Sequence, residues 1–139
     1  MGNKDVMCEA CTGSGKTLSF VIPALHRLLK LTENSNDSSI TYAFSVLILS
    51  PTRELATQTN AVIVGLLDKI KECKLKTLTC VGGVTKIDEN LEIIKNSEPE
   101  IIIATPGRLE DLMNRSEIVR AKLKQLEGQS PNLAKALSR

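Results

Sequence analysis

The stretch Glu9–Thr17 reads EACTGSGKT, and its small residues followed by Lys and Thr suit the binding of nucleotide phosphates. Gly13 and Gly15 allow the backbone to turn so that successive N–H groups converge on an anion. Lys16 adds a neutralising charge, and the Thr17 hydroxyl is placed to ligate the Mg²⁺ that accompanies the nucleotide. The stretch therefore predicts a phosphate loop for ATP or GTP, formed by Ala10, Cys11, Thr12, Gly13, Ser14, Gly15, Lys16 and Thr17.

The residues on either side of this loop favour the same prediction. Val6–Ala10 has the character of a short strand, and apolar residues recur at helical spacing after the loop, at Leu18, Ile22, Leu25 and Leu29. A helix that begins at the loop would add unpaired N–H groups and the positive end of its dipole. The common form of the motif begins with Gly, where this chain has Ala10. The alternative interpretation is a plain glycine turn between strand and helix.

The composition is that of a single globular domain, with 139 residues of which 42% are hydrophobic and 24% charged. The net charge of +2 is too small to indicate nucleic-acid binding by itself, so such a function would depend on particular arginines. Aromatic residues make up only 2% of the chain, which argues against base stacking and favours contacts to phosphates. Without a membrane span or a signal peptide, we expect an intracellular protein that does not contact membranes.

The four cysteines allow two interpretations. Cys8 and Cys11 form a Cys-x-x-Cys pair, which could be half of a zinc site or a redox couple. Six residues separate Cys73 from Cys80, and Cys11 lies inside the phosphate loop, where a metal would compete with the nucleotide. We therefore favour free intracellular thiols.

Apolar runs and amphipathic stretches alternate along the rest of the chain. The predicted strands are Phe44–Leu49, Leu78–Val81 and Ile101–Ala104. The predicted helices are Lys16–Leu31, with a kink at Pro23, and Glu54–Cys73, Asp88–Lys95 and Leu109–Asn114. Strands and helices that alternate at this spacing are typical of βαβ units. The predicted fold class is therefore α/β, with a parallel sheet flanked by helices on both faces.

Ligands of open α/β sheets gather at the carboxyl ends of the strands, and each predicted strand here ends in a distinctive cluster. These clusters are Pro51-Thr52-Arg53-Glu54, Gly82-Gly83 and Thr105-Pro106-Gly107-Arg108. Thr52 and Thr105 precede helices whose free N–H groups suit a phosphate, and the two arginines add charge and bidentate geometry. The simpler alternatives are a surface ion pair between Arg53 and Glu54 and a plain turn at Pro106-Gly107.

In this order the clusters resemble the first half of the core of a DEAD-box RNA helicase. The phosphate loop is similar to the family's ATP-binding motif, and PTRELA at Pro51–Ala56 to its first RNA-contact motif. Gly82-Gly83 resembles its double glycine, and TPGR at Thr105–Arg108 its next RNA-contact motif. The resemblance covers about residues 3–114 and implies a partial RecA-like P-loop domain that binds ATP with Mg²⁺.

The resemblance also implies a single strand of RNA as partner. Contacts to the RNA backbone would make binding independent of base sequence. Glycines would let the protein main chain approach the sugar-phosphate closely. The residues implied to bind RNA are Pro51, Thr52, Arg53, Glu54, Gly82, Gly83, Thr105, Pro106, Gly107 and Arg108.

Three shorter stretches are similar to the branch of the family that serves assembly of the large ribosomal subunit. They are Asn3–Val6, Phe20–Pro23 and Arg108–Asp111. This finer resemblance implies ribosome biogenesis, pre-ribosomal particles as partners and a location in the nucleus or nucleolus, with the cytoplasm as the alternative.

The chain also departs from the family pattern, because it contains no Asp-Glu-Ala-Asp. In that motif the Asp holds Mg²⁺ through water and the Glu orients the attacking water. Neither Asp88-Glu89 nor Glu110-Asp111 follows an apolar strand, as that chemistry requires. The upstream glutamine motif, the Ser-Ala-Thr motif and the second RecA-like domain of the family are missing as well.

We therefore predict a truncated piece of an RNA-dependent ATPase and helicase, with residues 1–115 as an incomplete RecA-like ATP-binding domain and no catalytic residue. The alternative is a non-catalytic shortened isoform or degenerate copy that binds only nucleotide, RNA or a partner. An unrelated phosphate-loop enzyme such as a kinase would leave both arginine motifs as coincidences.

Residues 116–139 do not resemble the family and are predicted to form a helical tail. Its first helix carries Val119, Leu123 and Leu126 and ends at Gly128, and a second begins at Ser130-Pro131 and carries Leu133 and Leu137. We expect its basic residues to form a solvated face rather than an RNA patch, at Arg120, Lys122, Lys124, Lys135 and Arg139. Since RecA-like sheets flank the first strand with strands missing here, we expect marginal stability or association through open edges.

Overall fold

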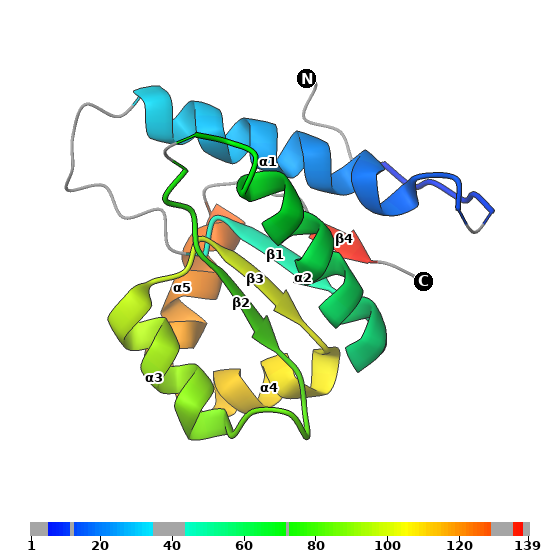
Figure 1. Cartoon of the computed structure of the whole chain (residues 1–139). Coiled ribbons are helices and arrows are strands. Elements are labelled where there is room, and N and C mark those ends of the chain that lie inside the picture. The colour runs from blue at the N-terminus through cyan, green and yellow to red at the C-terminus, as the bar shows by residue number, and fades with distance from the viewer. Residues whose placement is uncertain (1–5, 12, 35–43, 72, 129–134, 138–139) are drawn as a thin grey trace.

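The computed structural model of the chain describes residues 6–11, 13–34, 44–71, 73–128 and 135–137, and it shows a parallel sheet between two layers of helices (Figure 1). The helices are α1 (Lys16–Asn34), α2 (Arg53–Leu67), α3 (Ile87–Ser97), α4 (Pro106–Arg115) and α5 (Glu117–Gly128). The strands are β1 (Val46–Leu49), β2 (Thr77–Cys80), β3 (Ile101–Ala104) and β4 (Lys135–Leu137). The predicted α/β class with a parallel sheet is confirmed.

The strands lie in the order β2-β3-β1-β4, and every pair is parallel. In the register of β1, β2 and β3, Leu49 and Cys80 both lie beside Ala104. The ladder continues one residue further, because Ser50 N donates to Ala104 O at 2.9 Å and Thr105 N donates to Cys80 O at 3.2 Å. The loops that leave β1, β2 and β3 therefore begin level with one another, on the side of the molecule where α1 begins (Figure 1).

Each face of the sheet has its own hydrophobic core, as expected for strands covered by helices on both sides. Ile101 and Ile103 of β3 point into the core with α1 and α2, whereas Ile102 and Ala104 point into the core with α3, α4 and α5. All four side chains of β3 are buried. Two residues per face are typical of a four-residue central strand, so the run of apolar residues in the sequence is explained by burial on both sides.

The N-terminal segment differs from the prediction, because Val6–Ala10 forms no strand. Val6 is 86% exposed and Met7 is 99% exposed. A strand requires a neighbour for its N–H and C=O groups, and the outer edge of β1 is taken by β4 instead. The local apolar character of this segment was therefore a misleading signal.

The C-terminal segment confirms one predicted helix and corrects the other. The helix that carries Val119 and Leu123 is α5, and it ends at Gly128 as predicted. Leu137, predicted as helical, belongs to β4, whose backbone pairs with Leu47–Leu49 of β1. The proposed cap at Ser130-Pro131 and the apolar Leu133 lie outside the described residues. Pairing with the buried strand β1 outweighs the weak helical spacing of this short stretch.

The α5 helix is part of the core, since Val119 is fully buried and Leu123 is 8% exposed. Its Lys122 ammonium lies 2.8 Å from Glu98 Oε1 and 5.8 Å from the centre of the Phe44 ring. Both partners have a left-handed backbone, with φ of 62° at Phe44 and 45° at Glu98, which costs free energy in a residue with a Cβ. Lys122 thus ties α5 to the chain just before β1 and just after α3, and the prediction of a solvated side chain at this position was wrong.

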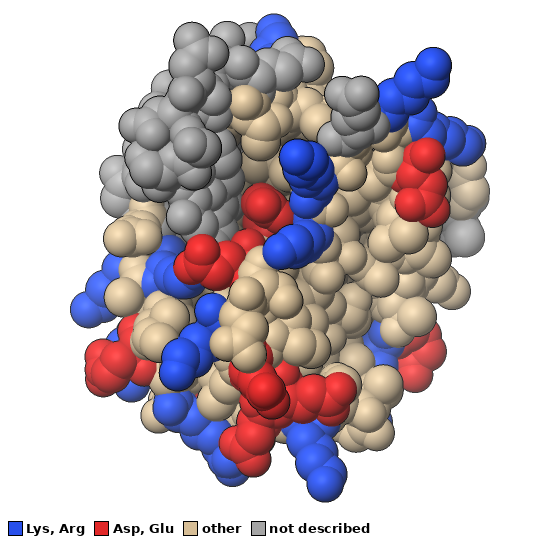
Figure 2. All heavy atoms as spheres, turned by 60° about the vertical axis from the view of Figure 1, so that its left-hand side comes forward, with Lys and Arg blue, Asp and Glu red and all other residues tan. Residues whose placement is uncertain are grey.

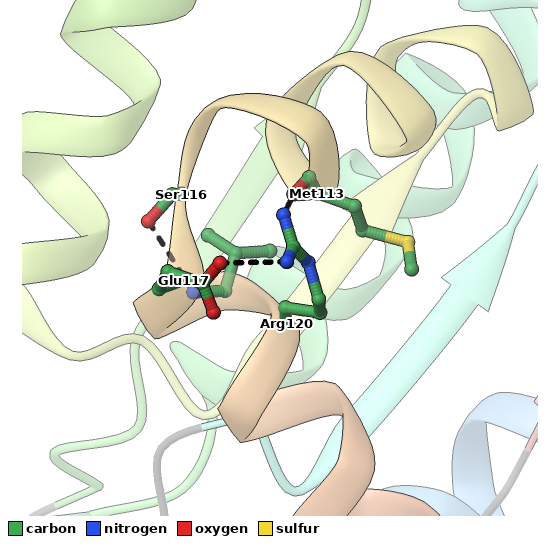
Figure 3. Close-up of polar contacts among 5 residues, drawn as sticks. Met113, Ser116, Glu117 and Arg120 are labelled. Carbon is green, nitrogen blue, oxygen red and sulfur yellow. Dashed lines mark hydrogen bonds and ion pairs between the residues drawn. The ribbon is translucent and has the colours of Figure 1, made fainter.

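The corner between α4 and α5 is closed by Arg120 (Figure 3). Its Nη2 donates to the Met113 carbonyl at 3.0 Å, and its Nη1 lies 2.6 Å from Glu117 Oε1. Ser116 Oγ accepts from Val119 N at 3.4 Å at the start of α5. Arg120 satisfies a carbonyl at the end of α4, where helices leave carbonyls unpaired.

Candidate functional site

The phosphate loop has the backbone that its glycines predicted. Gly13 has a φ of 81° and Gly15 a φ of 86°, values that residues with a Cβ rarely adopt. Ser14 donates to the Cys11 carbonyl from both its N–H, at 3.3 Å, and its Oγ, at 2.7 Å. These bonds hold the loop in a tight turn immediately before α1. Thr12, also predicted to bind the nucleotide, lies outside the described residues.

The loop opens directly into the N-terminus of α1. The first helical hydrogen bond joins Ser19 N to the Gly15 carbonyl at 3.0 Å, so the N–H groups just before it have no helical partner. No acidic residue lies in the first turn of α1, where it would repel an anion. The Lys16 Nζ donates to the Ala10 carbonyl across the loop, and Thr17 is half-buried beside it. Amide groups, one ammonium and one hydroxyl thus converge at this end of α1.

The three other predicted clusters come together in a single groove of about 510 Å³ at the carboxyl ends of β1, β2 and β3. None of the described phosphate-loop residues lines it. Gly83 and Pro106 adjoin it in the chain, and Asp111 is a member that the sequence analysis missed. The lining residues are Pro51, Thr52, Arg53, Glu54, Gly82, Thr105, Gly107, Arg108 and Asp111.

The N-terminus of α2 forms one wall of the groove. Thr52 is the N-cap, and its Oγ1 accepts a hydrogen bond from Leu55 N at 3.2 Å. Hydrogen bonds from the Glu54 backbone N–H and from Thr52, together with the charge of Arg53, hold the pKa of the Glu54 carboxyl below its usual value of 4.5. The side chains of Thr52 and Glu54 thus occupy N–H groups in the first turn of α2, and this wall carries a carboxylate that stays ionised at neutral pH.

The N-terminus of α4 forms the opposite wall. Thr105 is the N-cap and Pro106 occupies the first turn, where its missing N–H has no consequence. The Thr105 side chain makes no capping hydrogen bond, so the first N–H groups of α4 keep their capacity to bind an anion. Asp111 lies four residues after Gly107, on the same side of the helix. That spacing was the signal that could have placed its carboxylate in the groove.

The two arginines of the groove differ in their partners. Arg108 Nη2 donates to the Thr85 carbonyl at 3.0 Å, and its Nη1 lies 3.4 Å from Asn90 Oδ1. The Arg53 side chain, in contrast, forms no hydrogen bond or ion pair with any residue that the structure describes, although the Arg53 carbonyl accepts a hydrogen bond from Thr57 Oγ1 at 3.0 Å. The simpler alternative, a surface ion pair between Arg53 and Glu54, is therefore absent among these residues, and the Arg53 guanidinium keeps its donors.

Asn90 is a second residue that the sequence analysis missed. It lies on the buried face of α3 with Ile94, four residues later, and it is fully buried. The sequence could have indicated this residue, because Asn90 is polar at a position of α3 where the helical repeat places apolar residues. The Asn90 Nδ2 and the Arg108 Nε are buried without a hydrogen-bond partner among the described residues. The contact between these two side chains therefore keeps polar groups inside the protein.

The four cysteines are free thiols, of which Cys8 and Cys11 are exposed and Cys80 is buried. Burial raises the pKa of the Cys80 thiol from 9.0 to about 12, against the opposing effect of Arg108. Among the described residues no group of His, Cys, Asp and Glu is arranged to hold a metal ion. No helix in the described part of the chain has the length and apolar character required to cross a bilayer.

The surface around the β2 and α3 side of the molecule carries both signs of charge. Figure 2 shows Lys and Arg interspersed with Asp and Glu over this face. This mixture agrees with the small net charge of +2. Attraction for a polyanion would therefore come from local groups rather than from a broad positive field.

Comparison with curated proteins finds relatives among RNA helicases. The ATP-dependent rRNA helicase SPB4 of Meyerozyma guilliermondii is 42% identical over 127 residues, which are 90% of this chain and 21% of that protein. The ATP-dependent RNA helicase DDX55 of Danio rerio is 46% identical over 115 residues, which are 83% of this chain and 18% of that protein. The chain thus spans about a fifth of the length of these relatives.

Comparison with solved structures finds the same architecture. The DEAD-box helicase Mss116 bound to ssRNA and UDP-BeF matches with a TM-score of 0.74 and 26% identity, over 98% of this chain and 32% of that one. The sequence profile of DEAD/DEAH box helicases matches residues 1–128, from the N-terminus to the end of α5. The fold is thus a partial RecA-like domain, and the chain belongs to the DEAD/DEAH box helicase family.

Proposed function

We propose that the chain binds ATP at the phosphate loop and one strand of RNA across the groove. The observation that carries this proposal is the level register of β1, β2 and β3, which brings two helix N-termini and Arg53 to the same edge. Mss116, which shares the fold, was solved with ssRNA. Both curated relatives described above are named RNA helicases.

The groove is suited to phosphates rather than to bases. Its donors are the uncapped main-chain N–H groups at the start of α4 and the Arg53 guanidinium, both of which recognise anionic oxygens. The described lining residues include no aromatic side chain on which a base could stack. We therefore propose that RNA is held by its backbone and that binding is independent of base sequence.

At the nucleotide site the proposed roles follow from position. The loop N–H groups and Lys16 would hold the phosphates, and the half-buried Thr17 hydroxyl would ligate Mg²⁺ together with phosphate oxygens and water. One hydroxyl beside a nucleotide fits Mg²⁺, because this ion keeps several waters and needs few protein ligands. The ion would neutralise charge on the bound phosphates.

We further propose that these 139 residues bind ATP without turning it over, because they contain no Asp-Glu-Ala-Asp to orient a water. Hydrolysis and unwinding would belong to a protein that supplies those groups. Given the rRNA helicases among the relatives, the proposed RNA is ribosomal, the proposed partners are pre-ribosomal particles, and the proposed location is the nucleolus.

Nucleotide binding can be tested through Lys16 and the neighbouring thiol. Lys16→Ala should weaken MgATP binding about 10- to 100-fold through loss of a charge-assisted hydrogen bond, whereas Lys30→Ala, on an exposed position of α1, should have no effect. MgATP should also slow alkylation of the exposed Cys11, measured by mass spectrometry, and Lys16→Ala should remove this protection. Equal Cys11 alkylation with and without saturating MgATP would contradict the proposed site.

RNA binding can be tested by fluorescence anisotropy with a labelled single-stranded RNA. Arg53→Ala should weaken binding about tenfold and lower the slope of log K against log salt by about 0.7, the value for one phosphate contact on a single strand. Arg115→Ala is the control, because this arginine lies at the far end of α4 in an exposed ion pair with Asp88. Equal losses for both variants would show that the groove is not the RNA site.

A further inference from the structure

The double glycine after β2 packs against the side chain of Arg53. A Cβ placed on Gly83 would lie 2.4 Å from Arg53 Nη1 and 3.1 Å from its Cζ. At Gly82 the nearest atom to such a Cβ is Arg53 Nη2, at 3.8 Å, which is an ordinary contact. The space that a side chain of residue 83 would fill is therefore occupied by the Arg53 guanidinium.

Gly83 is the neighbour that the structure gives the Arg53 guanidinium. No carboxylate or carbonyl among the described residues accepts a hydrogen bond from it. Its backbone is held at the start of α2, and its guanidinium lies beside Gly83 at the edge of the groove. A planar guanidinium that is seated before the ligand arrives loses less conformational freedom on binding.

We infer that Gly83 is a positioning residue that acts through Arg53, by leaving room for the guanidinium to face an RNA phosphate in the groove. This inference rests on the proposed RNA-binding function and deepens it. It differs from a role in which the Gly83 main chain itself approaches the sugar-phosphate, the role expected from the sequence. In the direct role the two residues act independently, and in the positioning role the effect of Gly83 requires Arg53.

A double-mutant cycle in the full chain separates the two roles. Affinity for a labelled single-stranded RNA would be measured for the unchanged chain, Gly83→Ala, Arg53→Ala and the double variant, at several salt concentrations. We expect each single variant to lose about tenfold and the double variant to bind as Arg53→Ala does. We also expect Gly83→Ala to lower the salt slope as much as Arg53→Ala, although it removes no charge.

Two further variants control for backbone strain and for the Gly to Ala change itself. Gly83 has a φ of 79°, which Asn tolerates better than Ala, so strain alone would let Gly83→Asn recover affinity. We expect no recovery, because the Asn Cβ still meets the guanidinium. Gly65→Ala, in α2 with open space around it, should leave affinity unchanged.

A measurement on the unchanged chain keeps the inference testable if Gly83 variants fail to fold. Side-chain ¹⁵N relaxation should show the Arg53 guanidinium to be more ordered than that of the exposed Arg115. Equal mobility of the two, or a double variant that loses about a hundredfold, would overturn the positioning role while leaving the RNA site in place. Unchanged RNA affinity in Arg53→Ala would instead overturn the proposed RNA contact itself.

Discussion

Arg108 and Arg53 both lie in the first turn of a helix that follows a strand, yet their side chains meet different surroundings. Arg108 is half-buried and donates to the Thr85 carbonyl and toward Asn90, so it joins the loop after β2 to α3 and α4. Arg53 is exposed and rests on Gly83. The first arginine is thus tied to the folded structure, whereas the second is presented at the surface.

This difference predicts opposite effects of the two alanine variants on stability. Arg108→Ala should lower the free energy of unfolding by about 1–3 kcal/mol, because it leaves the Thr85 carbonyl and the buried Asn90 amide without a donor. Arg53→Ala should change it by no more than about 0.5 kcal/mol. Urea unfolding followed by circular dichroism would measure both. Similar losses for the two variants would contradict this assignment.

The buried Cys80 thiol predicts a dependence of stability on high pH. Its pKa of about 12 in the folded chain exceeds the ordinary value of 9.0, so the unfolded chain releases this proton first as pH rises. Stability from this group is therefore complete below about pH 9 and is lost progressively between pH 9 and pH 12.

Alkylation tests the burial of Cys80 directly, because the reaction of each thiol can be followed separately. With iodoacetamide at pH 8, the exposed Cys8 and Cys11 should react in the folded chain, and Cys80 should react only after unfolding. Peptide mass spectrometry with and without urea would follow each thiol. Reaction of Cys80 in the folded chain at the rate of Cys8 would show that it is not buried in solution.

At the scale of elements, local sequence patterns identified most helices and strands but not their partners. The apolar run at Ile101–Ala104 was sufficient to predict β3, because burial on both faces requires consecutive apolar residues. The helical spacing of apolar residues was likewise sufficient to predict α5. Val6–Ala10 and Leu137 were assigned wrongly, since a strand depends on a neighbour that may be distant in the chain. The contact between Arg53 and Gly83 could not be predicted either, because it joins the start of α2 to the loop after β2.

The burial of one side of α5 predicts a sharp contrast between neighbouring residues. Val119→Asp should lower the free energy of unfolding by about 3 kcal/mol or more, because it places a charge in a fully buried position. Ile118→Asp should be nearly neutral, since Ile118 is 47% exposed and an acidic residue suits the first turn of a helix. Thermal melts of the two variants would compare them. Equal losses would mean that α5 does not pack on the sheet in solution.

At the scale of the whole molecule, the sheet has one edge at β2 and the other at β4. Only three residues of β4 pair with β1, so a short segment separates the backbone N–H and C=O groups of β1 from solvent. An open strand edge is a template for pairing with another chain. The expected association of chains through the edge of β1 therefore depends on whether β4 stays paired with this strand.

Deletion of residues 135–139 should accordingly produce concentration-dependent association and a lower melting temperature. Deletion of residues 138–139 alone, which leaves β4 intact, is the control. Light scattering with size-exclusion chromatography would determine the mass of each species. A monomeric, cooperatively melting chain after the longer deletion would show that β4 does not protect this edge.

The level register of β1, β2 and β3 also decides where the chain can change in length. One added residue moves a strand end by about 3.3 Å, so an insertion between Ser50 and Pro51 would carry the start of α2 out of line with α4 across the groove. An insertion between Cys73 and Lys74, at the opposite ends of the strands, would leave that alignment untouched. We expect the first to abolish RNA binding and the second to preserve it in the anisotropy assay. The number of residues is therefore critical in the loops at the carboxyl ends of the strands, whereas the loops at the opposite ends can vary in length.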